Sequence, residues 1–125
     1  MMNNTLLVGR LVAEPEFKEF EGGKRVSNIT LAVPRSYKNE NGEYEADFID
    51  CVLWDSVAQN TAEYCKKGDL VGVRGRIQTN TYETETGEKR KVTQVVADRV
   101  SYLTNKQNVL DEEQNDKTEE EDLEV

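Results

Sequence analysis

Apolar residues alternate with polar ones in several short stretches of this chain, and a two-residue period is typical of half-buried β-strands. Within the first stretch, Leu7 and Leu11 fall on one face, while Leu6 and Val8 fall on the other. In the second, Ile29, Leu31 and Val33 alternate inward. The pattern predicts five strands, at Asn4 to Val12, Val26 to Pro34, Asp47 to Trp54, Asp69 to Thr81 and Lys89 to Leu103.

One segment has a helical period instead. It follows the third strand, and Ser56 with Gln59 three residues later fits a capping box. Gly68 after two lysines is a typical helix stop. Apolar and small residues occupy two adjacent faces, which predicts a broad packed stripe. One face carries Val57, Thr61 and Tyr64, and the other carries Ala58, Ala62 and Cys65.

The predicted order is three strands, a helix and two strands, which is the element order of an OB-fold, a five-stranded Greek-key barrel. Asn41-Gly42 predicts a hairpin before the third strand, and the segment from Thr84 to Gly87 predicts a turn before the fifth. Gly72 and Gly75 lie inside the fourth strand, where glycine favours the sharp bends that close a small barrel. We therefore expect an all-β OB-fold barrel with one helix between strands three and four.

Charge divides the chain into two parts. Residues 104–125 hold nine of the 25 acidic residues, against two lysines, and contain no aromatic residue, Gly or Pro. Residues 1–103 hold 14 basic and 16 acidic residues, so their net charge is about −2 and the tail accounts for the other −7 of the total −9. We expect a folded domain at 1–103 and a disordered acidic tail at 104–125. The low overall pI therefore does not exclude a positively charged surface on the domain.

Composition excludes several classes of protein. No apolar run approaches the roughly 20 residues that span a membrane, and no signal peptide precedes the two cysteines, Cys51 and Cys65. We expect a soluble protein in a reducing cytoplasm with both thiols free. Histidine is absent, which removes the commonest general base and metal ligand. We expect no cofactor and no metal site.

Large aromatic residues occupy unusual positions. In the third strand, Ile49, Cys51 and Leu53 form a core face, so Phe48 and Trp54 fall on the opposite face, about 20 Å apart. Tyr37 and Tyr82 stand at hairpin edges, each with basic residues nearby. Aromatic rings stack on bases while cations follow phosphates, so this pattern favours a single-stranded nucleic acid as ligand.

Five segments of the chain resemble the bacterial and phage single-stranded DNA-binding protein family. They cover residues 3–103 in order with consistent spacing: Leu6-Leu7-Val8-Gly9-Arg10-Leu11, Ile29-Thr30-Leu31-Ala32-Val33, Ala46-Asp47-Phe48-Ile49 with Val52-Leu53-Trp54, Lys66-Lys67-Gly68, and Val73-Arg74-Gly75-Arg76-Ile77. The resemblance implies an OB barrel that forms homotetramers. It also implies sequence-independent binding and protection of single strands in replication, recombination and repair, in a bacterial cell or a phage-infected host.

The resemblance also assigns residues. Its base-stacking positions fall on Tyr37, Phe48, Trp54 and Tyr82. Its phosphate-contacting positions are less sharply defined, and we assign them to Arg10, Arg35, Lys38, Lys67, Arg76, Lys89, Arg90 and Lys91.

The tail departs from the family pattern, which closes in a short acidic tip with Pro and Phe. This chain has the acidic run but not the Pro-Phe tip, so docking of host-type replication and recombination proteins there is not expected to follow the family pattern. A phage or plasmid origin, or a secondary paralogue, fits this departure. We expect any partner contact of the tail at its end, at Asp122, Leu123, Glu124 and Val125.

Two other classes of function are alternatives to DNA binding. An OB barrel can serve as an interaction or scaffold module, with its aromatics at a protein interface, and retention on DNA-cellulose would separate this from DNA binding. A carboxylate-metal nuclease would need Asp47 and Asp50 to converge. Alternation along the strand points these two side chains to opposite faces, which argues against an enzyme.

The tail generates the first prediction. Nine carboxylates tethered to a domain with a basic groove have a high local concentration there and compete with a phosphate chain. Truncation after Leu103 should therefore tighten binding to oligo-dT at low salt, and the gain should shrink as added salt screens the charges. Titrating both forms across a salt series measures this. Equal affinities at low salt would reject self-competition.

Overall fold

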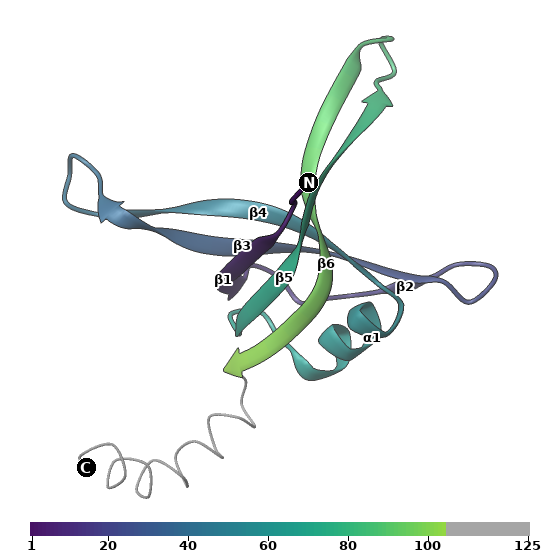
Figure 1. Ribbon diagram of the computed structural model, residues 1–125, viewed down its shortest axis with the longest axis horizontal. Coiled ribbons are helices and arrows are strands. Elements are labelled where there is room, and N and C mark those ends of the chain that lie inside the picture. Colours follow the sequence, from purple (N-terminus) through teal and green to yellow (C-terminus); the bar gives the residue numbers. More distant parts are fainter. Residues whose placement is uncertain (105–125) are drawn as a thin grey trace, which may run out of the picture.

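The computed structural model of the protein describes residues 1–104 (Figure 1). The predicted tail, with the expected partner contact at its end, lies outside the described residues except for Thr104. The elements follow the predicted order with one additional short strand. They are β1 (Thr5–Leu11), β2 (Lys18–Glu19), β3 (Arg25–Lys38), β4 (Tyr44–Trp54), α1 (Asp55–Tyr64), β5 (Leu70–Glu83) and β6 (Lys89–Thr104).

The strands form a closed five-stranded barrel, which confirms the predicted fold class. The sheet runs β1-β5-β6-β4-β3-β2, and an additional pairing of β1 with β3 closes it. The β4–β6 pair is parallel, through Cys51 to Leu53, and the other pairs are antiparallel. The barrel interior holds the side chains that alternation placed inward, such as Leu31, Leu53 and Val71, all with no exposed area.

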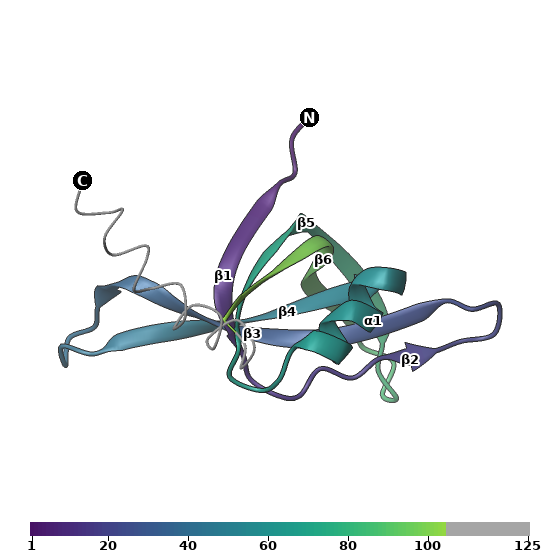
Figure 2. The same cartoon turned by 90° about the horizontal axis from the view of Figure 1, so that it is seen from below.

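Three hairpins project from the barrel, and each includes at least one long strand. The β3–β4 and β2–β3 hairpins extend in opposite directions (Figures 1 and 2), and the β5–β6 hairpin rises between them (Figure 1). The turns at Asn41-Gly42 and Thr84 to Gly87 form as predicted, with Gly42 and Gly87 at positive φ. β2 was not predicted; its two residues pair with β3 across a turn that contains Gly22 and Gly23.

The predicted helix ends need correction. Trp54 is the N-cap and no side chain caps the helix, so the capping box at Ser56 and Gln59 is wrong. The physical reason lies in Asp55, the first helical residue, whose carboxylate accepts a hydrogen bond from the Arg25 N–H at 3.3 Å and ties the helix start to β3. Gly68 is not the stop either. The helix ends at Tyr64, and Gly68 forms the turn before β5, where its N–H donates to the Leu11 carbonyl at 2.8 Å.

Of the two glycines expected at bends of the fourth strand, only Gly75 lies at one. The β5–β6 register shifts between Arg74 and Gly75, and a Cβ at Gly75 would lie 2.1 Å from the Val96 carbonyl oxygen. At Gly72 the nearest atom to an added Cβ would be a Leu103 methyl carbon at 3.7 Å, an ordinary contact. Gly75 is therefore required by the close approach of β6, whereas Gly72 is not.

This difference gives a prediction about stability. Gly75→Ala forces backbone atoms apart and should lower the free energy of unfolding by about 1–3 kcal/mol or more. Gly72→Ala is the matched control and should be neutral or slightly stabilising, because alanine restricts the unfolded chain. Urea unfolding of both variants at one protein concentration measures the effect. Equal midpoints would contradict the close approach.

Candidate nucleic-acid interface

The outer face of β4 presents two large aromatic side chains to solvent. Phe48 is 69% exposed and Trp54 is 44% exposed, while Cys51 and Leu53 between them point into the core. Ala32 on β3 lies opposite Phe48, and Val26 lies opposite Trp54. The two rings therefore stand on the same face of β4, as alternation predicts.

Asp50 and Val52 lie between these rings on the outer face of β4, and they differ in their contacts and exposure. Asp50 accepts a hydrogen bond from the Thr30 hydroxyl at 2.8 Å, so its carboxylate is engaged by the neighbouring strand. Val52 is only 5% exposed, although it shares the outer face. It pairs with Val96 at the base of the β5–β6 hairpin, and Val96 is also buried. The hairpin thus divides the face into a Phe48 side and a Trp54 side.

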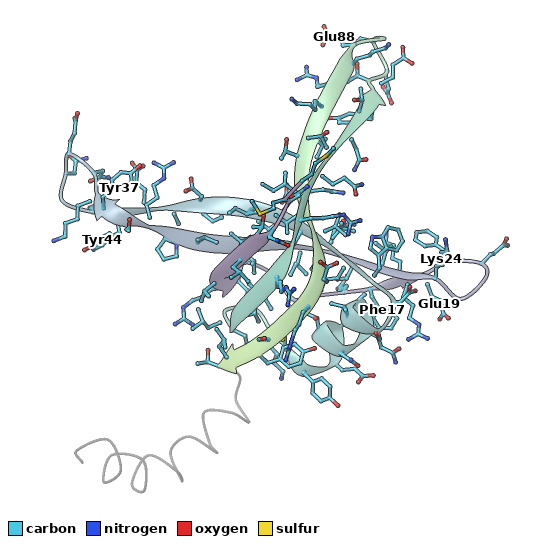
Figure 3. All side chains as sticks on the ribbon, in the orientation of Figure 1. Phe17, Glu19, Lys24, Tyr37, Tyr44 and Glu88 are labelled. Carbon is cyan, nitrogen blue, oxygen red and sulfur yellow. The ribbon has the colours of Figure 1, made fainter. Side chains whose placement is uncertain are left out.

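The β3–β4 hairpin carries two further exposed rings. Tyr37 is 64% exposed, and Tyr44, which the sequence analysis did not assign, is 61% exposed. Lys38 lies opposite Tyr44, with its ammonium nitrogen 5.6 Å from the ring centre. Figure 3 shows both tyrosines close to the tip of this arm. A lysine at this distance is held by a cation–π interaction while its charge remains open to solvent.

Arg35 is held by carboxylates rather than open to a phosphate. Its guanidinium donates to Asp47 at 2.8 Å and to Glu45 at 2.9 Å. The hydrogen bond from Arg35 lowers the pKa of Asp47, and the same contact raises the pKa of Arg35. The cluster of Arg35, Glu45 and Asp47 carries a net charge of −1. The assignment of Arg35 to a phosphate stays a prediction, and it requires one carboxylate to give way.

The β5–β6 hairpin places the remaining aromatic opposite a cation. Tyr82, 51% exposed, pairs with Arg90 in the antiparallel register. Lys91 pairs with Thr81 and Lys89 with Glu83, so both lysines project on the other face of the hairpin. The structure therefore brings Arg90 beside Tyr82 and does not bring Lys89 and Lys91 to the same face.

Besides Arg35, two further predicted cations form exposed ion pairs. Arg90 lies 3.3 Å from Glu88, and Arg76 lies 3.6 Å from Asp98. Exposed pairs of this kind contribute little free energy, so a phosphate can replace the carboxylate at small cost.

Arg10 and Lys67 lie at one end of the barrel. Arg10 is opposite Ala32, which is opposite Phe48, so these three residues form one row across β1, β3 and β4. Two strand spacings put Arg10 about 10 Å from Phe48. The Arg10 guanidinium donates to the Gly68 carbonyl at 3.0 Å, in the turn that also holds Lys67. This row brings a stacking candidate and a cation together.

Sequence reasoning missed the exposed aromatics of the β2–β3 hairpin. Phe17 is 38% exposed and Phe20 is 54% exposed. The signal that could have found them is the Gly22-Gly23 pair, which supports a hairpin turn directly after Phe20.

The cysteines and carboxylates of residues 1–104 do not form a reactive-thiol site or a metal site. Cys51 and Cys65 are free and buried, and burial raises the pKa of each thiol to about 11. Among residues 1–104, no group of three or more Cys, Asp or Glu side chains is placed to hold a metal ion. No helix in this part of the chain has the length and apolar character that crossing a bilayer requires.

Comparison with known proteins agrees with this geometry. Residues 2–103 match the model of the single-strand binding protein family. The chain is 52% identical over 103 residues to single-stranded DNA-binding protein B of Bacillus subtilis, covering 82% of this chain and 91% of that protein. It is 50% identical to single-stranded DNA-binding protein 3 of Listeria innocua (86% and 68% covered) and to protein 1 of that name from Lactococcus lactis (82% and 69% covered).

The carboxylate cluster around Arg35 generates a prediction. Asp47→Asn removes one negative charge and leaves the Arg35 guanidinium with the Glu45 carboxylate, so binding to oligo-dT should tighten several-fold at low salt. If Arg35 then neutralises one further phosphate, the slope of log affinity against log salt should steepen by about 0.7. Fluorescence titration over a salt series measures both quantities.

Glu63→Gln is the matched control for charge, because it removes one carboxylate from the exposed face of α1. Its salt slope should equal that of the wild-type protein. The same slope in Asp47→Asn and Glu63→Gln would show that Arg35 does not reach a phosphate.

Proposed function

The chain belongs to the single-strand binding protein family, and we propose that it binds single-stranded DNA without reading its sequence. In this role it coats and protects strands during replication, recombination and repair, in the cytoplasm of a bacterial or phage-infected cell. It acts as a binding protein rather than an enzyme and uses no cofactor.

The observation that carries this proposal is the set of exposed rings on one barrel face and two of its hairpins. Tyr37, Phe48, Trp54 and Tyr82 are each between 44% and 69% exposed. Large exposed apolar side chains mark interaction sites when they gather on one surface. Every base has a π-face, so stacking on these rings supports affinity without sequence preference.

Cations beside the rings supply the electrostatic part of binding. Lys38 lies at the tip of the Tyr37 arm, Arg90 opposite Tyr82, and Arg10 in the row of Phe48. Acidic residues are interleaved with them, because residues 1–103 hold 16 carboxylates against 14 cations. Few positions can therefore form an uninterrupted phosphate track. We expect only a handful of ion pairs per protomer and a moderate salt dependence.

The apolar strip on β1 supports assembly into a homotetramer. Leu6 is 79% exposed and Val8 is 53% exposed, and shallow grooves lined by Leu103, Ala32 and Pro34 flank them. Such a strip buries its area when copies of the chain associate. Light scattering tests this, and a mass of 14.3 kDa, that of one chain, would contradict it.

The four exposed rings, Tyr37, Phe48, Trp54 and Tyr82, form the stacking platform, and this platform generates a prediction. Stacking contributes about 1–3 kcal/mol per base, so Trp54→Ala should weaken binding to oligo-dT about tenfold or more per protomer. The melting temperature should change little, because Trp54 is 44% exposed. Fluorescence anisotropy of a labelled oligo-dT measures the affinity.

Tyr64→Ala provides the control, since Tyr64 is a similarly exposed ring (56%) that contacts Tyr102 from α1. Its affinity should match that of the wild-type protein. Wild-type affinity in both Trp54→Ala and Phe48→Ala would overturn the platform.

A further inference from the structure

The β2–β3 hairpin continues the surface on which Trp54 stands. Trp54 lies opposite Val26, and Val26 lies opposite Lys18 on β2. Residues directly opposite each other share one face of a sheet, so the three side chains form a row across β4, β3 and β2. The outer face of β4 therefore extends onto this hairpin without interruption.

Phe20 belongs to the same face. Its N–H donates to the Lys24 carbonyl at 2.7 Å, so the hairpin ladder continues beyond the last strand pair and sets Phe20 against Lys24. Both residues lie two positions from the Lys18–Val26 pair, and a two-residue step returns to the same face. Two strand spacings and two residues put the Cα atoms of Phe20 and Trp54 about 12 Å apart. The hairpin thus presents a second ring within a short step of the first.

The two phenylalanines of this hairpin face opposite ways. Phe17 is two residues before Glu19, so the two side chains share one face of the hairpin. Figure 3 shows both below the hairpin, on the side where α1 lies, and Lys24 above it. Phe17 is 38% exposed, while Phe20 on the Trp54 face is 54% exposed. Packing in the barrel does not explain Phe20, since it is absent from the core and from the apolar residues that pack against the core.

The charges of this face suit an anionic strand. Lys18 and Lys24 share it with Phe20, and within residues 1–104 neither lysine forms an ion pair. Glu19 lies opposite Arg25 in the strand register, and both side chains are on the other face of the hairpin. Glu21 is in the turn itself. An exposed ring between two unpaired cations is the arrangement that base stacking with phosphate contacts requires.

We propose that Phe20 stacks on a base and that Lys18 and Lys24 contact the flanking phosphates, so that single-stranded DNA continues past Trp54 onto the β2–β3 hairpin. The proposal rests on the proposed function and adds a segment to the path of the strand. The ligand of this surface is DNA because the surface adjoins Trp54 and carries two cations, Lys18 and Lys24, without ion pairs within residues 1–104.

A single tryptophan makes the test direct, since Trp54 is the only one in the chain. The double variant Phe20→Trp/Trp54→Phe moves the one indole to position 20 and keeps a ring at position 54. Saturating oligo-dT should quench this indole. The matched control is Phe17→Trp/Trp54→Phe, whose indole lies on the other face of the same hairpin and should keep its fluorescence.

Affinity provides the second measurement. Phe20→Ala should weaken binding to oligo-dT at least about fivefold, the lower end of the effect of losing one stacked base, with the mass of the assembly unchanged. An unquenched indole at position 20, or wild-type affinity in Phe20→Ala, would overturn the proposal. A lower assembly mass in Phe20→Ala would also overturn it, because Phe20 would then belong to a contact between copies.

The two levels of the argument fail differently. If the wild-type protein does not bind oligo-dT, the proposed function fails. If Trp54 is quenched and the indole at position 20 is not, only the extension onto the β2–β3 hairpin fails.

Discussion

The close approach of backbone to backbone at two glycines is the constraint on which the barrel depends. A Cβ at Gly75 would lie 2.1 Å from the Val96 carbonyl oxygen, and one at Gly9 would lie 2.7 Å from the Ala32 carbonyl oxygen. The Gly9 contact lies where β1 meets β3 and closes the sheet, and the Gly75 contact lies where β5 bends against β6. At each of the two positions, only glycine leaves room for the neighbouring carbonyl oxygen. The hairpins that carry the exposed rings can project in fixed directions because the wall behind them is closed.

A small core supports a large exposed aromatic surface in this molecule. Within residues 1–104, the interior is built from short branched side chains and alanine, together with two cysteines, and no aromatic residue is among its buried members. The exposed rings of the candidate interface lie on the outer face of β4 and on the hairpins, while Tyr102 on β6 packs against the core and Tyr64 lies on α1. This division separates stability, which depends on the aliphatic interior, from recognition, which depends on rings in contact with solvent. It explains why exchanging a ring should affect the ligand more than the fold.

Much of this arrangement can be predicted from the sequence, because alternation along a strand is a local property. The inward residues Ile29, Leu31 and Leu53 and the outward Phe48 and Trp54 follow from parity alone. Features that depend on contacts between distant segments could not be predicted. The capping box failed because Asp55 bonds to the Arg25 N–H on another strand, and the burial of Val52 depends on β6 pairing with β4. β2 escaped notice because two residues are too few to show a period.

The buried thiols have a practical meaning for anyone who labels this protein. Cys51 and Cys65 are 1% and 3% exposed, and burial raises the pKa of both to about 11. At neutral pH both are therefore protonated and shielded from maleimide reagents, since the thiolate is the reactive form. A cysteine introduced at a hairpin tip can then take up a fluorophore selectively in the native background. A fluorophore placed in this way on one hairpin at a time would report ligand contact at each hairpin separately.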